Sequence, residues 1–394
     1  MKDSVAKYAF VLIVIALFSF AIYKRVSLFG QVGGDVETYV EAVEDLIDGK
    51  NPYARTVETF KHLDTNPGNK GFSYLPGILY TNTFFYSIYL FLYNLHPCNE
   101  LLQTGFCTPM IYFWKIPMLL ADVGVGVLLY KILKDKSKIA TIFALAVWFL
   151  NPFIVLKNDF ITNDAIPIFF MLLSLYYLGK DEIASGASYA MAVGTKTFPI
   201  FILPVMLIGA KDKKKFILST ALVGIAMSLP FMLNISEFMT YMQGSVFVHG
   251  DRFVQGRPFL FYISYWKSIE LIQILPIALY TYLATFGGWL AIIIVRSLKW
   301  LKDTYALSTL SFIIFYLFTP VLNRTYLLWF LPVFLVGTFN VTYGFTSIDN
   351  RNFFSKIGFK HSKYLYYVVV IAYWAFYYWY LAQWKDGFHI HARI

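Results

Sequence analysis

Charged residues are scarce in this sequence. Lys, Arg, Asp and Glu together make up 14% of the 394 residues, whereas 58% of the residues are hydrophobic. A soluble globular domain carries roughly 25% charged residues, because its surface has to face water. The shortage of charge therefore excludes a soluble protein and indicates a chain that lies mostly within a lipid bilayer.

Signatures of soluble cofactor enzymes are also missing. The sequence has no Walker loop, no dinucleotide-binding glycine fingerprint, no H-E-x-x-H and no G-x-S-x-G. We therefore expect no soluble nucleotide cofactor. The formal net charge of +10 would suggest nucleic acid in a soluble protein. Here the basic residues cluster in short loops between apolar segments, which membrane topology explains better, so no nucleic-acid partner is expected.

Cysteine is rare as well. The two cysteines, Cys98 and Cys107, lie in one polar loop. With one nearby histidine they make a poor zinc site, because structural zinc needs four ligands. Two interpretations stay open: unrelated thiols, or a local disulfide, which requires the oxidising side of the membrane.

Long apolar segments recur along the whole chain and predict an all-α fold. The prediction is a polytopic transmembrane helical bundle of about ten or eleven membrane helices, the first being an uncleaved signal anchor. We treat residues 1–394 as one membrane domain that includes the outer loops 30–110 and 234–272. The expected spans are 8–29, 112–133, 139–156, 165–179, 183–210, 216–233, 275–298, 304–321, 326–345 and 364–384.

The basic loops predict the orientation of these spans. Cytoplasmic loops are enriched in Lys and Arg, so the loops 131–138 and 211–215 are placed inside together with the N-terminus. Lys24 and Arg25, at the outer end of the first span, are exceptions to this bias. Large segments at 30–74 and 234–272 then lie outside.

Two apolar stretches do not fit a simple crossing. If 75–95 crossed fully, the basic loop 131–138 would lie outside, so we expect 75–95 to lie along or dip into the outer leaflet. This placement leaves both cysteines outside and favours the disulfide. The stretch 183–210 is interrupted by Gly, Lys and Pro, which predicts two short helices that meet at mid-membrane depth.

Acidic side chains mark the outer loops. Asp35 and Glu37 begin a predicted amphipathic helix over 36–47; they are either catalytic carboxylates or ordinary helix-start residues. Asp159 and Asp164 form a second pair, which is either functional or a solvated turn in which Asp164 caps the next helix. Asp122 lies inside an apolar helix, and such a carboxylate usually faces a cavity or a partner.

Cations and aromatic residues supply further candidates. Lys196 lies at the break in 183–210 and needs an anion, which is either a phosphate or a carboxylate such as Asp122. In the second outer loop, His249, Arg252 and Arg257 suit a lipid phosphate, or bind anionic headgroups without specificity. Tyr326 and Trp329, at an outer helix end, are also explained by an aromatic belt.

The order of these segments resembles the GT-C class of integral-membrane glycosyltransferases, and within it the catalytic subunits of GPI mannosyltransferase I and their prokaryotic relatives. Glu37 departs from the acidic D-x-D motif of that family, whose second position is Asp. The segments that carry the resemblance are Asp35-Val-Glu37, Gly49-Lys-Asn-Pro52-Tyr53-Ala-Arg55, Tyr74-Leu-Pro76, Asn151-Pro152, Lys196-Thr-Phe-Pro199, His249-Gly-Asp-Arg252 and Tyr326-Leu-Leu-Trp329.

The resemblance implies an inverting transfer of a sugar, with mannose favoured, from a polyprenyl- or dolichyl-phosphate donor. The acceptor would be a glycan, glycolipid or protein on the outer face of a prokaryotic, archaeal cell membrane. Asp35 would be the catalytic base beside Glu37, and the two would hold a divalent cation (Mg or Mn) if one is used. The donor phosphate would be met by His249, Arg252, Arg257 and Lys196. The acceptor or pocket residues would be Tyr53, Arg55, Tyr74, Asp122, Asp159, Asp164, Tyr326 and Trp329.

Two other interpretations stay open. A transporter or lipid flippase would also show mid-membrane charges such as Lys196 and Asp122 on a broken helix. It would not explain the large acidic outer loop, and the sequence has no internal repeat. The chain could also work with a small accessory subunit, because some relatives need one.

Overall fold

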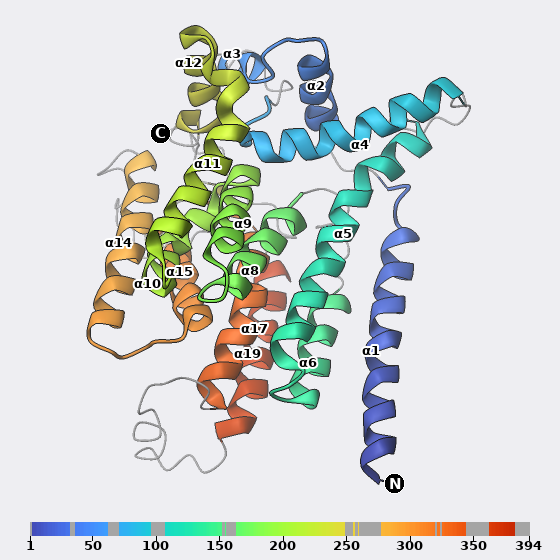
Figure 1. Ribbon diagram of the computed structural model, residues 1–394, viewed down its shortest axis with the longest axis vertical. Helices are drawn as coiled ribbons and strands as arrows, with labels where there is room; N and C mark the ends of the chain where they lie inside the picture. The colour runs from blue at the N-terminus through green and yellow to red at the C-terminus, as the bar shows by residue number, and fades with distance from the viewer. Residues whose placement is uncertain are drawn as a thin grey trace. The chain divides into compact units, whose positions relative to one another are not determined.

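The computed structural model consists almost entirely of α-helices, so the predicted all-α class is confirmed (Figure 1). Its only strands, within the described residues, are the two-residue parallel pair β1 (Gln255–Gly256) and β2 (Val321–Leu322). The structure describes residues 2–31, 36–61, 71–95, 107–151, 154, 163–248, 255–256, 259, 277–319, 321–323, 325–343 and 362–382.

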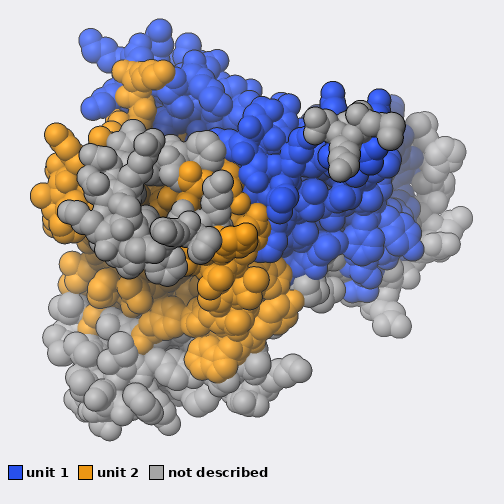
Figure 2. Space-filling model, turned by 90° about the horizontal axis from the view of Figure 1, so that it is seen from below, with its two compact units in different colours: residues 1–199, 212–248 blue, residues 200–211, 249–394 orange. Residues whose placement is uncertain are grey.

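Two compact units divide the chain (Figure 2). The first unit comprises residues 1–199 and 212–248, and the second comprises residues 200–211 and 249–394. The prediction of a single membrane domain stays a prediction, and each unit is described by itself below.

The first unit contains most of the predicted outer elements. Its helices are α1 (Lys2–Val26), α2 (Val36–Ile47), α3 (Ala54–Lys61), α4 (Pro76–Leu95), α5 (Thr108–Leu133), α6 (Lys138–Phe149), α8 (Ala165–Tyr177), α9 (Glu182–Thr195), α11 (Lys213–Met232) and α12 (Ile235–Ser245). The helix α2 has the bounds that the apolar spacing predicts. Figure 1 shows α4 lying crosswise to α1 and to the lower part of α5, in keeping with a helix along the outer leaflet.

The second unit contains α10 (Leu203–Gly209), α14 (Ile277–Ser297), α15 (Thr304–Phe318), the single turn α16 (Tyr326–Trp329), α17 (Leu331–Thr342) and α19 (Ser362–Ala382). The 3-10 turn η1 (Phe198–Ile202) leads from α9 toward α10. Two short helices therefore replace one long span over 183–210, as predicted. The break falls where Lys196 adopts an extended backbone (φ −156°, ψ 143°) and Pro199 follows.

Polar side chains at the helix starts explain where several of these apolar helices begin. The side chains of Ser137, Asp181, Asp212, Asn234 and Asp303 accept hydrogen bonds from backbone N–H groups in the first turns of α6, α9, α11, α12 and α15. Such caps satisfy N–H groups that have no partner inside the helix. The polar residues between the apolar segments thus determine where these helices begin.

Within the described residues, three helical segments are long and apolar enough to cross a membrane by themselves: Val5–Val26, Thr108–Leu133 and Lys213–Met232. Six shorter apolar helices accompany them: Lys138–Phe149, Ala165–Tyr177, Phe198–Gly209, Tyr282–Ser297, Thr304–Phe318 and Leu331–Thr342. The outward-facing residues of α1 and α11 are mostly large and apolar, as expected for helices that face lipid. The protein is thus a membrane protein built as a helical bundle.

Candidate functional site

A buried ion pair joins two of the predicted site residues. The ammonium of Lys196, just past the end of α9, contacts the carboxylate of Asp164 at the start of α8. The Asp164 side chain is fully buried and that of Lys196 is 16% exposed. Of the two partners that the sequence left open for Lys196, a carboxylate is present, and it is Asp164 rather than Asp122.

Asp164 does not act as the helix cap that the sequence offered as an alternative. It occupies the N-cap position of α8, but its side chain makes no capping hydrogen bond. The capping interpretation is therefore wrong. A carboxylate taken out of water needs a partner of opposite charge, and here Lys196 supplies it.

Tyr74 completes this group. The Lys196 ammonium lies 5.3 Å from the centroid of the Tyr74 ring, within the range of a cation–π contact. Close backbone packing brings the two together, because a side chain at Gly77 of α4 would lie 2.7 Å from the carbonyl oxygen of Gly194 in α9. Glycine at this position therefore lets the start of α4, with Tyr74 just before it, approach the end of α9.

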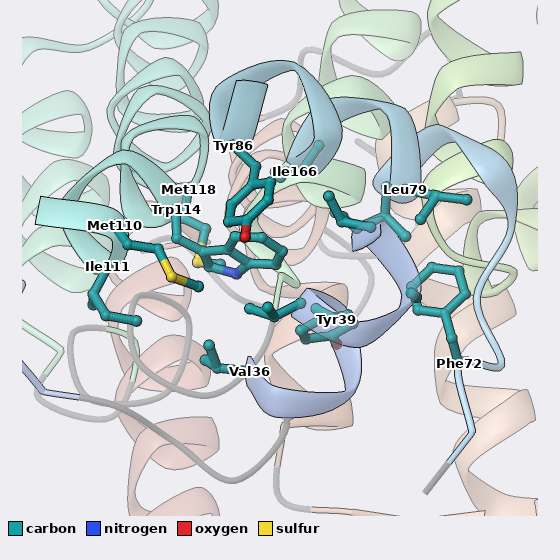
Figure 3. Close-up of a cluster of buried hydrophobic side chains, with 14 of the residues drawn as sticks. Val36, Tyr39, Phe72, Leu79, Tyr86, Met110, Ile111, Trp114, Met118 and Ile166 are labelled. Carbon is teal, nitrogen blue, oxygen red and sulfur yellow. The ribbon is translucent and has the colours of Figure 1, made fainter. Parts of the chain in front are cut away.

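A row of aromatic rings extends from Tyr74 into the core of the first unit. The Tyr74 ring lies 5.3 Å from that of Tyr39 in α2, which in turn lies 6.5 Å from the ring of Trp114 in α5. Figure 3 shows Trp114 and Tyr39 within the buried cluster that also includes Val36 and Ile166. The cluster links the first turns of α2 and α8, the two helices that directly follow Asp35 and Asp164 in the sequence.

Lys115 is a buried cation that the sequence analysis missed. It lies on α5 with 1% of its surface exposed, and its ammonium donates to the carbonyl oxygen of Gln31, four residues before Asp35. The signal was present, because an ammonium in the apolar run 112-YFWKIPMLL-120 is as unusual as Asp122 further along the same helix. Its burial makes it a candidate alongside Lys196.

The turn 49–55 has a structural role in the described residues. Gly49 has φ +72°, a left-handed conformation that favours glycine, and it ends α2. The side-chain oxygen of Asn51 accepts a hydrogen bond from the backbone N–H of Tyr53 at 3.0 Å. Its amide nitrogen donates to the carboxylate of Glu237 in α12. Arg55 pairs with Glu41 and Asp45 of α2 and so holds α3 against α2.

Tyr53 is fully buried among aromatic rings. Its ring packs 5.8 Å from Phe72, 5.2 Å from Phe231 and 5.1 Å from Tyr241. Burial raises the pKa of the Tyr53 hydroxyl well above its usual value of 10.0, because the phenolate would be stripped of water. The described contacts make Tyr53 an anchor between the outer turn and helices α11 and α12.

Asp122 has a partner that accounts for its burial. Its carboxylate pairs with the guanidinium of Arg25 in α1, and both side chains are fully buried. Arg25 also donates to the carbonyl oxygens of Ala21 (3.2 Å) and Phe149 (3.3 Å), which ties α1 to α6. The pair explains why Arg25 breaks the charge bias of the loops: it is held in the bundle rather than in a loop.

Tyr326 and Trp329 belong to the second unit. Their rings stack with centroids 3.8 Å apart, and Tyr316 donates to the backbone carbonyl of Tyr326. This stacked pair lies within the single turn α16, immediately before α17.

Several predicted residues lie outside the described residues: Asp35, Asp159, Cys98, His249, Arg252 and Arg257. Cys107 is in a disulfide, while its proposed pairing with Cys98 stays a prediction. Glu37 is exposed on α2. No group of three or more His, Cys, Asp or Glu side chains that could hold a metal ion occurs in the described part of the chain, and the predicted divalent cation stays a prediction.

Comparison with known families decides the class of the protein. The model of glycosyltransferase family 87 matches residues 108–320, which is more than half of the 394-residue chain. The chain belongs to glycosyltransferase family 87. The match begins at the first residue of α5 and includes Asp164 and Lys196, so the buried pair of this family 87 member lies within the shared region.

Similar proteins carry a more specific name. GPI mannosyltransferase 1 of Candida albicans is 23% identical over 266 residues, covering 58% of this chain and 64% of the relative. GPI mannosyltransferase 1 of Kluyveromyces lactis is 26% identical over 153 residues, 38% of each chain. The family 87 chain thus spans less than two thirds of the length of these relatives. The resemblance to membrane glycosyltransferases is confirmed.

Proposed function

We propose that this glycosyltransferase moves a sugar, with mannose favoured, from a polyprenyl- or dolichyl-phosphate donor to an acceptor hydroxyl on the extracytoplasmic face. Transfer would invert the anomeric carbon, and the acceptor would be a glycan, glycolipid or protein. The observation that carries the proposal is the buried Lys196–Asp164 pair against Tyr74, at one end of the aromatic row that reaches the first turn of α2.

Asp35 is proposed as the base. Val36, the residue after Asp35, and Ala165, the residue after Asp164, are both fully buried in one cluster. In the sequence, Asp35 directly precedes the first residue of α2, as Asp164 directly precedes the first residue of α8. In the proposed step, Asp35 takes the proton of the acceptor hydroxyl. The oxygen of that hydroxyl then bonds to the anomeric carbon, while the bond between this carbon and the phosphate oxygen breaks.

The leaving phosphate needs positive charge in a low-dielectric site. Lys196 is a candidate for this charge, because its ammonium lies beside the buried Asp164 carboxylate at the end of α9. Lys115, next to the segment that leads to Asp35, is a second candidate. The cations His249, Arg252 and Arg257 of the second outer loop remain part of the proposal.

The test is transfer of radiolabelled mannose from polyprenyl-phosphate mannose by the purified protein in detergent. Asp35→Asn should reduce kcat by about 100-fold or more, which is the usual effect of removing a general base. The matched control is Asp48→Asn. The Asp48 side chain lies just after the same outer helix, is 58% exposed and forms a surface ion pair with Lys50, so its charge should matter little. Asp35→Asn with near-normal transfer would show that the assigned base is wrong.

The same preparation separates an enzyme from a carrier. Protein in liposomes should transfer sugar without moving the lipid donor between leaflets. Flux of the donor without transfer would contradict the proposed reaction and favour the flippase interpretation instead.

A further inference from the structure

Three buried polar groups of the first unit have no partner within the described part of the chain. Both amide atoms of Asn82, both amide atoms of Asn163 and the indole N–H of Trp114 make no hydrogen bond. The exposed fractions of these residues are 1%, 4% and 1%. Buried polar groups in proteins are nearly always hydrogen-bonded, so several neighbouring exceptions call for an explanation.

The three groups border the same aromatic cluster. Asn82 is one turn before Tyr86 on α4, both side chains are buried, and the Tyr86 ring lies 6.3 Å from that of Trp114. Asn163 is three residues before Ile166, which belongs to the same buried cluster as Tyr86 and Trp114 (Figure 3). Trp114 is also the inner end of the aromatic row that leads through Tyr39 to Tyr74 and Lys196.

We propose that Asn82, Trp114 and Asn163 form a subsite that takes the hydroxyl groups of a sugar ring. The inference rests on the proposed function and assigns the sugar contacts of that site. Hydroxyls both donate and accept, so they match two amides and one indole N–H. The surrounding rings fit the apolar carbon face of the same sugar, since ligand sites combine aromatic walls with a few placed polar groups.

A charged side chain next to Asn163 in the sequence supports a sugar as the ligand. Asn163 directly precedes Asp164, whose carboxylate is paired with Lys196. A sugar bound to the three polar groups would therefore have its phosphate or its acceptor oxygen near the Lys196–Asp164 pair. A free lipid tail would leave the amides without partners and is disfavoured by the same argument.

The experiment compares Asn82→Leu and Trp114→Phe with the control Ser87→Leu, which changes an exposed residue of α4. Trp114→Phe keeps an aromatic ring while it removes the N–H donor, although the ring becomes smaller, so it provides a second variant if Asn82→Leu folds poorly. Removing one hydrogen bond to a bound sugar should raise KM about tenfold, or about 1.4 kcal/mol, while Ser87→Leu leaves KM unchanged. A rise in KM for the donor assigns the subsite to the transferred sugar, and a rise in KM for the acceptor assigns it to the acceptor sugar.

Binding provides a readout that does not depend on transfer. Methyl α-mannoside, methyl α-glucoside and methyl α-galactoside are added in turn to the detergent-solubilised wild-type protein, and the thermal midpoint is measured. We expect at least one glycoside to raise the midpoint, and the rise to be lost in both subsite variants but kept in Ser87→Leu.

The outcomes distinguish the two proposals. No transfer by the wild type, together with a glycoside shift that depends on Asn82 and Trp114, contradicts the proposed reaction and supports the subsite. Normal transfer with unchanged KM and no dependence of the shift on either residue overturns the subsite. A higher thermal midpoint for Asn82→Leu with unchanged KM also overturns it, because the amide would then only destabilise the fold and would not contact a sugar.

Discussion

The Arg25–Asp122 pair allows a sharp test of what holds α1 against the rest of the first unit. Both side chains are fully buried, so removing one charge leaves the other without its counter-ion in a low-dielectric interior. Asp122→Leu or Arg25→Met alone should destabilise the protein by about 3–5 kcal/mol. The double variant should come within about 1 kcal/mol of the wild type, because replacing a buried pair with apolar groups of similar volume is often neutral.

Thermal unfolding in detergent measures all four proteins of this double-mutant cycle. The control is Lys24→Met, which removes the neighbouring charge from an exposed position; it should change the midpoint little. Because each single variant should cost about 3–5 kcal/mol and the double variant no more than about 1, the coupling between the two sites should be about 5 kcal/mol or more. If Asp122→Leu alone were as stable as the wild type, or the effects of the single variants simply added, the ion pair would not stabilise α1.

Activity in the same variants tests a second interpretation of Asp122. The sequence also marked it as a pocket residue. If its role is to pair with Arg25, the folded fraction of the double variant should transfer sugar at a rate close to that of the wild type. A folded double variant without activity would instead support Asp122 as a pocket residue of the active site.

Three further predictions concern Lys196, Gly49 and Tyr53. Lys196→Met should lower kcat more than Asp164→Asn, because only the first removes the charge proposed to meet the phosphate; equal effects on stability and none on kcat would contradict this. Gly49→Ala should cost about 1–2 kcal/mol in thermal unfolding, since φ +72° is strained for a residue with a Cβ. Unfolded tyrosine ionises near pH 10 while the pKa of buried Tyr53 is higher, so stability should fall as the pH rises above about 10. Tyr53→Phe should weaken that loss in pH-dependent unfolding, and an unchanged slope would place Tyr53 in contact with water.

Much of the fold followed from local sequence. The apolar spacing gave α2 its bounds, and Gly, Lys and Pro at 194–199 predicted the break between α9 and α10. These features are local: they depend on helical periodicity, on caps and on residues that cannot continue a helix. The resemblance of short motifs to membrane glycosyltransferases likewise needed only their order in the chain.

The partners of the charged residues could not be predicted in this way. Lys196 is 32 residues from Asp164, and Arg25 is 97 residues from Asp122. Their pairing depends on which helices pack together, and the sequence offered several carboxylates of equal standing. The contact of Lys115 with Gln31 could not be predicted for the same reason, because it forms only when α5 packs against the segment after α1.

By itself the sequence determined that this chain forms apolar helices with polar ends, because each residue carries its own preference for lipid, water or a helix terminus. Only the tertiary structure decided which charges neutralise one another and which buried amides have no partner among the described residues. The physical reason is that a charge or amide in a low-dielectric interior is governed by atoms within a few ångströms of it, and those atoms come from distant parts of the chain.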